Sequence, residues 1–293
     1  MRFPGTSANL GPGFDAVGLA MGLWLGVRAE VADSFSVTAA GRDAELCGAL
    51  EGNLILETYR RVAGAESTKL RVFVENGIPV GMGCGSSAAA ILAGVSMANH
   101  FESMGWSAQQ VMEEACRIEG HPDNVAACWL GGFVVSAMNG SGVIATSCGR
   151  ERKWKLMVVV PGKGLATSKA RGMLPQSYSK EDVVFSVQRV GLLVAAMARG
   201  QGDLLRVAME DRIHQPYRAE ACPMLGKLLP MAGDGGVLGV ALSGAGPSVL
   251  LVLDEGVDVS LVEAGVRERV GAEVEMLVTG IAGGAVESFG GTG

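Results

Sequence analysis

The stretch GMGCGSSAAA, residues 81–90, places three alternating glycines and two serines directly before a run of alanines. Because glycine loses more backbone entropy on folding than other residues, a cluster of glycines needs a structural reason. One reason is a loop that wraps closely around a ligand, followed by a helix whose N-terminal N–H groups and dipole attract an anion such as phosphate. The alternative is an ordinary turn before a core helix, and this stretch alone leaves both interpretations open.

The composition of the chain indicates a folded protein whose main partner is not a nucleic acid. Its 293 residues are enough for one large domain or two closely packed ones. The net charge is −6, and the 24 lysines and arginines form no run. No apolar segment is long enough to span a bilayer, and the start MRFPGTSANL does not resemble a signal peptide. The six cysteines form no C-x-x-C pair, so we expect reduced thiols and a cytoplasmic location.

The hydrophobic pattern predicts strands and helices without a regular β-α-β alternation. Alternating apolar residues predict a strand over 23–31, and helical spacing with Ser107 as N-cap predicts a helix over 107–119. Further strands are expected at 35–39, 70–74, 133–137, 156–160, 237–242, 248–253 and 274–279, and further helices at 53–63, 86–101, 181–199, 203–213, 224–231 and 259–269. This order favours an α+β fold with largely antiparallel sheets over a doubly wound parallel fold. The charged stretch GRERKW (149–154) marks a weak domain boundary.

Two other glycine-containing loops accompany the first one, TSANLGPGFD (6–15) and LSGAGPS (242–248). Three such loops, each beside a strand or helix, suggest backbones that converge on a ligand. The common phosphate signatures are absent, because no Gly-Lys-Ser or Gly-Lys-Thr occurs and no G-x-G-x-x-G opens a Rossmann unit. A bound phosphate would therefore be held by backbone N–H groups, serine hydroxyls and a metal ion, without a Walker lysine.

Several segments, taken together, resemble the GHMP kinases and, within that superfamily, the homoserine kinases. GMGCGSSAAA after Pro79 resembles the phosphate loop of the superfamily, and LSGAGPS is also a superfamily feature. The segments specific to homoserine kinases are PGTSANLGPGFDAVGLA (4–20) and DRIHQPYR (211–218). Between them, EGHPDNVAAC (119–128) and TSKAR (167–171) also resemble segments of that family, in the same order. Two features depart from the family: Cys84 stands where leucine is usual, and only three residues precede Pro4, so we expect the first strand to be short or missing.

The resemblance implies the GHMP kinase fold and a reaction. It implies a ribosomal-protein-S5-like domain in residues 1–150 that binds ATP, and a ferredoxin-like domain in residues 151–293 that completes the acceptor site. The implied reaction is the ATP- and Mg²⁺-dependent phosphorylation of the side-chain hydroxyl of L-homoserine to O-phospho-L-homoserine in threonine biosynthesis. A homodimer is a further family expectation. The alternatives are a kinase for another small alcohol, such as L-threonine, and a relative that binds ligands without catalysis.

The resemblance assigns the nucleotide and the metal ion to the glycine loop. It implies ATP contacts from Pro79, Gly81, Gly83, Gly85, Ser86 and Ser87, with Asn53 and Leu54 beside the adenine. It also implies that Ser87 and Glu113 hold Mg²⁺ and are catalytic. Glu113 lies opposite the apolar face of its helix, so a solvated surface carboxylate explains the sequence equally well.

The resemblance also implies how a zwitterionic amino acid would bind. Arg171 and Arg218 would hold its carboxylate in a forked geometry, and Asp15 would bind its ammonium group. Asn9 would contact the reacting hydroxyl as a catalytic residue. The other acceptor-site residues that the resemblance implies are His121, Asp123, Asn124, Thr167 and Gly244. Singly, such residues are more often a surface arginine, a turn aspartate, a capping asparagine or a core histidine. No carboxylate clearly fills the role of a base, so direct proton transfer to the phosphate stays open.

Overall fold

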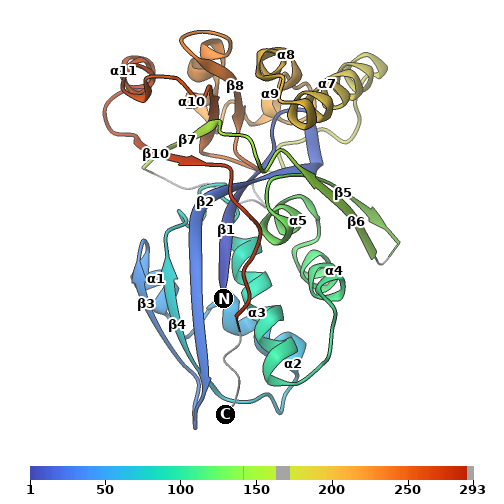
Figure 1. Cartoon of the computed structure of the whole chain (residues 1–293), viewed down its shortest axis with the longest axis vertical. Helices are drawn as coiled ribbons and strands as arrows, with labels where there is room; N and C mark the ends of the chain where they lie inside the picture. The colour runs from blue at the N-terminus through green and yellow to red at the C-terminus, as the bar shows by residue number, and fades with distance from the viewer. Residues whose placement is uncertain (141, 163–171, 289–293) are drawn as a thin grey trace.

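In the computed structural model, which describes residues 1–140, 142–162 and 172–288, the chain forms two sheets that lie one above the other (Figure 1). The first sheet has the order β3-β4-β2-β5-β6, and β1 pairs with β2. Its strands are β1 (Arg2–Asn9), β2 (Gly13–Val31), β3 (Ser36–Gly41), β4 (Leu70–Asn76), β5 (Phe133–Asn139) and β6 (Gly142–Cys148). Its pairs are antiparallel except for β3 with β4.

The long strand β2 organises the first sheet because it pairs with β1, β4 and β5 along its length. The alternation expected over residues 23–31 is present only in its middle, where Leu25 and Val27 are buried and Arg28 is exposed; Val31 at its end is 67% exposed. The expectation of a short or missing first strand was wrong. Strand β1 spans eight residues and is buried from Phe3 onward, because β2 covers its edge and the helices cover its face.

Among the described residues, five helices accompany the first sheet, and α2 to α5 lie against one of its faces (Figure 1). They are α1 (Ala44–Gly48), α2 (Leu54–Ala63), α3 (Ser86–Phe101), α4 (Ala108–Glu119) and α5 (Asp123–Leu130). The expected N-cap is present, since Ser107 and Gln110 form a capping box at the start of α4. Helix α4 ends at Gly120, whose left-handed backbone is a common helix stop. The short helix α5, which the hydrophobic pattern did not predict, begins directly after this turn.

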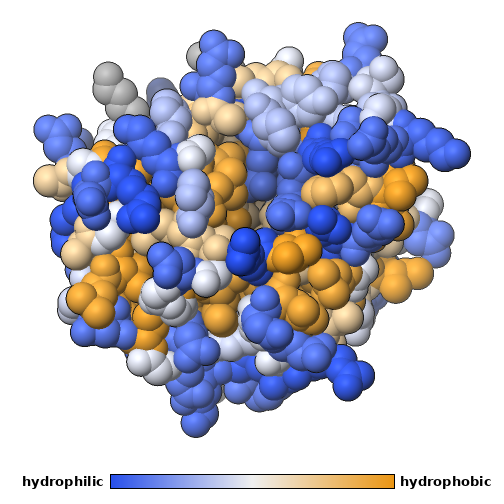
Figure 2. All heavy atoms as spheres, turned by 90° about the horizontal axis from the view of Figure 1, so that it is seen from above, coloured by the Kyte–Doolittle hydropathy of each residue, from blue (hydrophilic) through white to orange (hydrophobic). Residues whose placement is uncertain are grey.

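The second sheet is antiparallel throughout, in the order β10-β7-β9-β8. Its strands are β7 (Lys155–Val160), β8 (Val237–Leu242), β9 (Val249–Leu253) and β10 (Glu275–Gly280). Its helices are α7 (Lys180–Arg199), α8 (Leu205–Ala208), α9 (Gln215–Arg218), α10 (Pro223–Leu228) and α11 (Val259–Val270), with 3-10 turns at Gly202–Leu204 and Leu229–Met231. Seen from the side of these helices, the surface is largely hydrophilic with smaller hydrophobic areas between (Figure 2).

The helix expected over residues 203–213 is present only in its first half. Helix α8 ends at Ala208, and α9 begins only at Gln215. The carboxylate of Asp211 causes the break, because it accepts hydrogen bonds from the backbone N–H groups of the three residues Ile213, His214 and Gln215. An aspartate that binds the backbone ahead of it competes with helix continuation and caps the next helix.

One hydrophobic cluster spans both sheets, and a second one, which includes Met157, Leu225 and Val262, belongs to the second sheet and its helices. The first cluster includes Phe133 of β5, Leu156 of β7, Leu193 of α7 and Leu250 of β9. The chain after β10 also returns to the first sheet (Figure 1), where isolated bridges join residues 281, 283 and 286 to residues 21, 131 and 2. The expected α+β fold with mostly antiparallel sheets is confirmed. A division between residues 150 and 151 stays a prediction.

None of the helices in the described ranges combines the length and the apolar character that crossing a bilayer requires.

Candidate active site

The three glycine-containing loops meet at one place, the N-terminus of α3. The N–H of Thr6 donates to the carbonyl of Cys84 at 2.9 Å, and the hydroxyl of Ser243 donates to the carbonyl of Gly83 at 2.7 Å. A Cβ atom at Gly83 would lie 2.3 Å from the carbonyl oxygen of Ser243, and one at Gly85 would lie 1.9 Å from the hydroxyl of Thr6. Both glycines also have a φ near +70°, which side chains rarely adopt. The glycine loop therefore lies so close to the two neighbouring loops that a side chain at either glycine would collide with them.

A cavity of about 330 Å³ lies on one side of this loop, and we call it the apolar cavity. Leu25, Leu54, Ile55 and Val74 are among its walls, and Ser86 and Ser87 at the start of α3 also line it. Asn53 also lines it and caps α2.

The cap holds the wall of the apolar cavity in place. The side chain of Asn53 accepts from the N–H of Leu56 and donates to the carbonyls of Cys47 and Ala49. Asn53 therefore fixes the start of α2, so that Leu54 and Ile55 line the cavity.

A smaller cavity of about 110 Å³ is also lined by this loop, and we call it the polar cavity. It shares Gly81, Ser86 and Ser87 with the apolar cavity. Its other walls carry the expected acceptor residues Asn9, Asp15, His121, Asp123, Asn124, Arg218 and Gly244, together with the expected loop glycines 83 and 85. The structure thus brings these sequence-predicted residues together. Pro79 is buried just before the loop and is not part of either lining.

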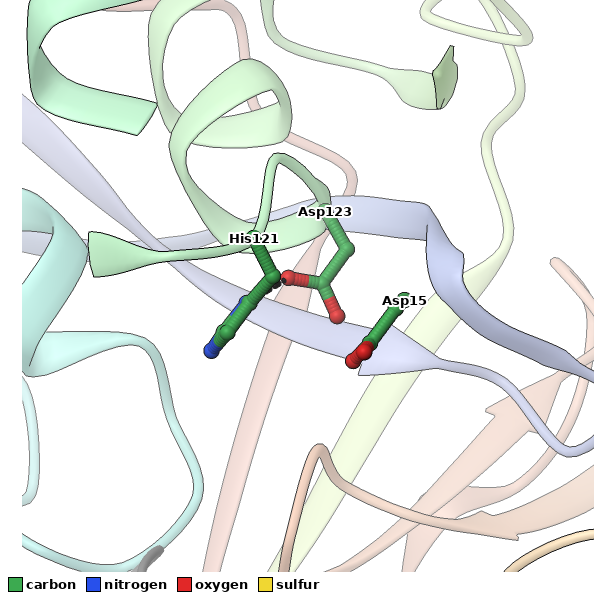
Figure 3. A group of neighbouring side chains, drawn as sticks. All are labelled: Asp15, His121 and Asp123. Atoms are coloured by element: carbon green, nitrogen blue, oxygen red, sulfur yellow. Dashed lines mark hydrogen bonds and ion pairs between the residues drawn. The ribbon is translucent and has the colours of Figure 1, made fainter. Parts of the chain in front are cut away.

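Two acids and a histidine form one group in the polar cavity (Figure 3). Ligand atoms of Asp15, His121 and Asp123 all lie within 4.8 Å of one another. Nδ1 of His121 lies 2.5 Å from Oδ1 of Asp123, which also accepts from the N–H of Asn124. Burial disfavours the charged imidazole, but the hydrogen bond to Asp123 and the charges of Asp123, Glu119 and Asp15 outweigh it and raise the pKa of His121. The group is a negatively biased pocket that suits a cation.

The end of β1 and the start of β2 are strained where they meet this pocket. Asn9 and Asp15 have φ values of 70° and 55°, in the left-handed region that residues with a Cβ seldom occupy. They support one another, because the side-chain oxygen of Asn9 accepts from the N–H of Asp15 at 3.0 Å. The amide nitrogen of Asn9 donates to the carbonyl of Gly244 at 3.0 Å. Strain of this kind persists where surrounding contacts hold it, which here fixes two predicted site residues.

Arg218 supplies the positive charge of the polar cavity. Only 2% of the residue is exposed, and its Nη1 lies 3.0 Å from Nδ1 of His214 and 3.3 Å from the carbonyl oxygen of Gly244. The guanidinium carbon lies 5.5 Å from the centre of the Phe14 ring. Sequence reasoning missed His214, although its place one helical turn before Arg218 was a usable signal.

The expected metal pair of Ser87 and Glu113 requires a correction. Glu113 accepts hydrogen bonds from the side chain of Gln109 at 2.8 Å and from the N–H of Val143 at 3.4 Å, towards β6. The carboxylate that meets Ser87 is Glu119, whose Oε2 accepts from the serine hydroxyl at 2.9 Å.

Helix geometry explains the difference. Glu113 stands six positions before Glu119 on α4, roughly 9 Å along the axis and on another face. Only Glu119, the last residue of the helix, lines the polar cavity. The signal for it was its place inside the segment EGHPDNVAAC.

Asn124 also has a defined partner, because its side-chain oxygen accepts from the hydroxyl of Thr6 at 2.8 Å. Two further expected acceptor residues, Thr167 and Arg171, lie outside the residues that the structure describes.

Comparison with known proteins identifies the family. The description "GHMP kinases N terminal domain" matches residues 53–132, and "GHMP kinases C terminal" matches residues 193–272. The chain is 47% identical to homoserine kinase of Solibacter usitatus (strain Ellin6076) over 262 residues, which cover 87% of this chain and 85% of that protein. It is 40% identical to homoserine kinase of Desulfitobacterium hafniense (strain DSM 10664 / DCB-2) over 256 residues, 86% of each chain.

Solved structures agree with this result. The homoserine kinase of Cytophaga hutchinsonii matches with a TM-score of 0.80 and 25% identity, over 97% of this chain and 95% of that one. The mevalonate kinase of L. major matches with a TM-score of 0.74 at 15% identity, over 96% of each chain, and shows that the fold is shared. The three converging glycine loops and the two adjoining cavities agree with these matches. Because the two sequence relatives above are 40 to 47% identical over most of its length, the chain belongs to the homoserine kinases of the GHMP kinase superfamily.

Proposed function

We propose that this protein transfers the γ-phosphoryl group of ATP to the side-chain hydroxyl of L-homoserine, giving O-phospho-L-homoserine for threonine biosynthesis. The observation that carries the proposal is the pair of cavities that share Gly81, Ser86 and Ser87. One cavity is apolar and large enough for part of a nucleotide. The other places a buried arginine in the same small space as two aspartates, which matches an acceptor with both a carboxylate and an ammonium group.

The glycine loop and α3 account for binding of the triphosphate. A helix N-terminus with free N–H groups and a positive dipole end stabilises phosphate, and α3 is a 16-residue helix that begins at Ser86. Asn53 and Leu54 line the apolar cavity, and we propose that the adenine base binds beside them. Phosphoryl transfer depends mainly on positioning and charge neutralisation, so a preorganised loop of this kind is the central catalytic element.

The residues present fit a magnesium ion. Ser87 and Glu119 offer a hydroxyl and a carboxylate oxygen 2.9 Å apart at the start of α3, and Mg²⁺ commonly takes one or two protein oxygens together with phosphates and water. When bound there, Mg²⁺ neutralises charge on the transferring phosphoryl group. We propose Glu119, and not Glu113, as the carboxylate ligand.

The acceptor would bind across the polar cavity. Asp15, with Asp123 and His121 beside it, would hold the ammonium group, and Arg218 would hold the carboxylate, with Arg171 proposed from the sequence as a second arginine. Asn9 and Asn124 would contact the hydroxyl and orient it towards the loop.

The proton of the hydroxyl needs a destination. Asp123 already accepts hydrogen bonds from His121 and Asn124. Asp15 would face the ammonium, and Glu119 the metal. We therefore propose that the hydroxyl proton moves directly to the phosphoryl oxygen as a loose transition state forms.

Coupled ADP-release assays with homoserine, threonine, serine and mevalonate in parallel test the proposed function. We expect the highest kcat/KM with homoserine, and phosphorus NMR should identify the product as a phosphate monoester on the side chain. Equal or higher kcat/KM with threonine or mevalonate would assign another acceptor. ADP release with none of the four would favour a binding protein without catalysis. The homodimer stays a prediction, which sedimentation analysis checks.

A further inference from the structure

His214 and Arg218 form a buried pair at the turn that begins α9. The side chain of His214 is fully buried, and its Nδ1 lies 3.0 Å from Nη1 of Arg218. Its second ring nitrogen, Nε2, lies 2.9 Å from the carbonyl oxygen of Gly11. Gly11 belongs to the loop between β1 and β2; Asn9 is the last residue of β1, and Asp15 lies near the start of β2. The imidazole therefore connects the guanidinium of Arg218 to the loop between β1 and β2.

The two contacts define the tautomer of this imidazole. A guanidinium can only donate hydrogen bonds, and a carbonyl oxygen can only accept them. Nδ1 of His214 must therefore be the acceptor for Arg218, and Nε2 must carry the proton that it donates to Gly11. Burial lowers the pKa of His214 to about 4; the Asp211 carboxylate opposes this shift, and the charge of Arg218 adds to it. The ring is neutral at physiological pH.

The surroundings hold this ring in one orientation. Asp211, whose side chain is also fully buried, accepts a hydrogen bond from the backbone N–H of His214 at 2.9 Å. The ring of Phe14 lies 5.5 Å from the imidazole, centre to centre, and the same ring lies 5.5 Å from the guanidinium carbon of Arg218. A Cβ atom at Gly11 would lie 2.1 Å from the carbonyl oxygen of Met209, so the loop is packed directly on the segment before α9.

We propose that His214 is a positioning residue of the acceptor site: its neutral imidazole orients the guanidinium of Arg218 towards the carboxylate of the amino acid and keeps the Gly11 loop in register with it. The inference rests on the proposed function, since it takes Arg218 as the carboxylate-binding residue. Without the imidazole acceptor, Nη1 of Arg218 loses its 3.0 Å contact with His214 and keeps the 3.3 Å contact with the carbonyl of Gly244. The guanidinium can then turn, and the carboxylate of the acceptor is bound less well.

Two substitutions separate the two hydrogen bonds of the ring. In His214→Gln, the amide reaches the position of Nε2 and can donate to Gly11, but Arg218 loses its acceptor. In His214→Asn, the amide oxygen reaches the position of Nδ1 and can accept from Arg218, but Gly11 loses its donor. We expect His214→Gln to raise KM for homoserine by about tenfold to a hundredfold, with KM for ATP within about twofold of wild type. His214→Asn should stay closer to wild type, and His100→Gln, on α3, is the matched control.

A double-mutant cycle shows whether His214 acts through Arg218. In an Arg218→Leu background, His214→Gln should raise KM for homoserine by no more than about twofold further, because the group that it positions is gone. An inactive wild type would overturn the proposed function and this inference with it. An active wild type in which His214→Gln leaves KM for homoserine unchanged, or raises both KM values equally, would overturn this inference alone.

One measurement does not depend on enzymatic activity. NMR of the wild-type protein with ¹⁵N-labelled histidine reports which ring nitrogen of each histidine carries the proton. We expect one histidine to be neutral, with the proton on Nε2, from pH 8 down to pH 5, and the His214→Asn spectrum assigns that signal. A proton on Nδ1 of His214, or a charged ring at pH 6, would contradict the proposal.

Discussion

Glu113 and Glu119 share one helix, but only Glu119 contacts the serine at the start of α3. Glu119→Gln keeps the shape of the side chain and removes its charge, so it should lower kcat on the order of a hundredfold. Glu113→Gln should change kcat by less than about threefold, since its contacts are to Gln109 and Val143. Steady-state kinetics of both variants, with thermal unfolding as the folding control, measure the difference. A larger loss in Glu113→Gln would restore the pair expected from the sequence.

Arg218 gives a second prediction at the scale of single residues. A carboxylate held by a buried arginine is bound by charge-assisted hydrogen bonds. Arg218→Leu should therefore raise KM for homoserine by on the order of tenfold to a thousandfold, while KM for ATP scarcely changes. Arg218→Lys should recover only part of the loss, because lysine lacks the forked geometry. An ATP defect of equal size in Arg218→Leu would remove this residue from the acceptor pocket.

His214 also links stability to pH. Its folded-state pKa of about 4 lies below the ordinary value of 6.5, so between these values the unfolded chain binds a proton that the folded chain does not. The free energy of unfolding should therefore rise as pH increases from 4 to 6.5 and then level off. One pKa unit corresponds to about 1.4 kcal/mol, so the contribution is roughly 3 kcal/mol at most.

Urea unfolding at several pH values measures this effect. Asp211 and Asp15 also face the ring and Arg218 lies beside it, so the comparison that isolates His214 is the slope in wild type against His214→Gln. Equal slopes in the two proteins would mean that His214 does not titrate in this way.

At the scale of elements, the glycine loop distinguishes two kinds of glycine. A Cβ atom at Gly81 would meet nothing within 4 Å, whereas one at Gly85 would collide with the hydroxyl and backbone nitrogen of Thr6. Gly81→Ala should therefore cost only the strain of its left-handed φ, about 1 to 2 kcal/mol. Gly85→Ala should cost clearly more, about 3 kcal/mol or above, because β1 or the loop must move. Urea unfolding of both variants gives the comparison, and similar losses would contradict the close packing of loop and strand.

Elements with strong local signals were predictable from the sequence, and those fixed by distant contacts were not. The capping box of Ser107 and the alternation around Leu25 gave α4 and part of β2 correctly. The break before α9 depends on where the carboxylate of Asp211 points, which cannot be read from the hydrophobic pattern of the sequence. In the site, too, the residues with strong local signals were predictable: the segments around Asn9, Asp15 and Arg218 were found as motifs.

Two site residues were missed for the same physical reason. Glu119 depends on the turn at Gly120, which sets the carboxylate against Ser87. His214 depends on the fold that brings Gly11 to its ring.

At the scale of the whole molecule, the site belongs to both sheets. The apolar cavity is built by elements of the first sheet, while the polar cavity also needs Arg218 of α9 and Gly244 after β8. The hydrophobic cluster that spans both sheets and the returning C-terminal segment hold these two parts in register. A domain that carried only residues 1–150 would lack the positive charge of the polar cavity. The geometry of the acceptor site therefore depends on contacts that fasten one sheet to the other.

Removal of the segment 281–286 tests whether the geometry of the acceptor site depends on contacts between the two sheets. Ala282 accepts from the N–H of Gly132 and donates to Ala20, and Val286 exchanges two backbone hydrogen bonds with Arg2. A Cβ atom at Gly284 would lie 2.2 Å from the carbonyl of Trp129, so the segment is tightly packed. Each buried backbone hydrogen bond contributes about 1 kcal/mol, so truncation after Gly280 should cost about 3 kcal/mol or more and lower Tm by roughly 5 to 10 °C.

Truncation after Ser288 is the control for this experiment, because it leaves every one of these bonds in place. The segment joins β10 to the first sheet, so truncation after Gly280 should also raise KM for homoserine more than KM for ATP. The reason is that the apolar cavity is built by the first sheet and its helices, whereas the polar cavity needs residues from both sheets. Differential scanning calorimetry and steady-state kinetics on the two truncated chains measure both effects. If truncation after Gly280 left Tm and KM for homoserine at the values of the longer truncation, the returning segment would not hold the two sheets in register.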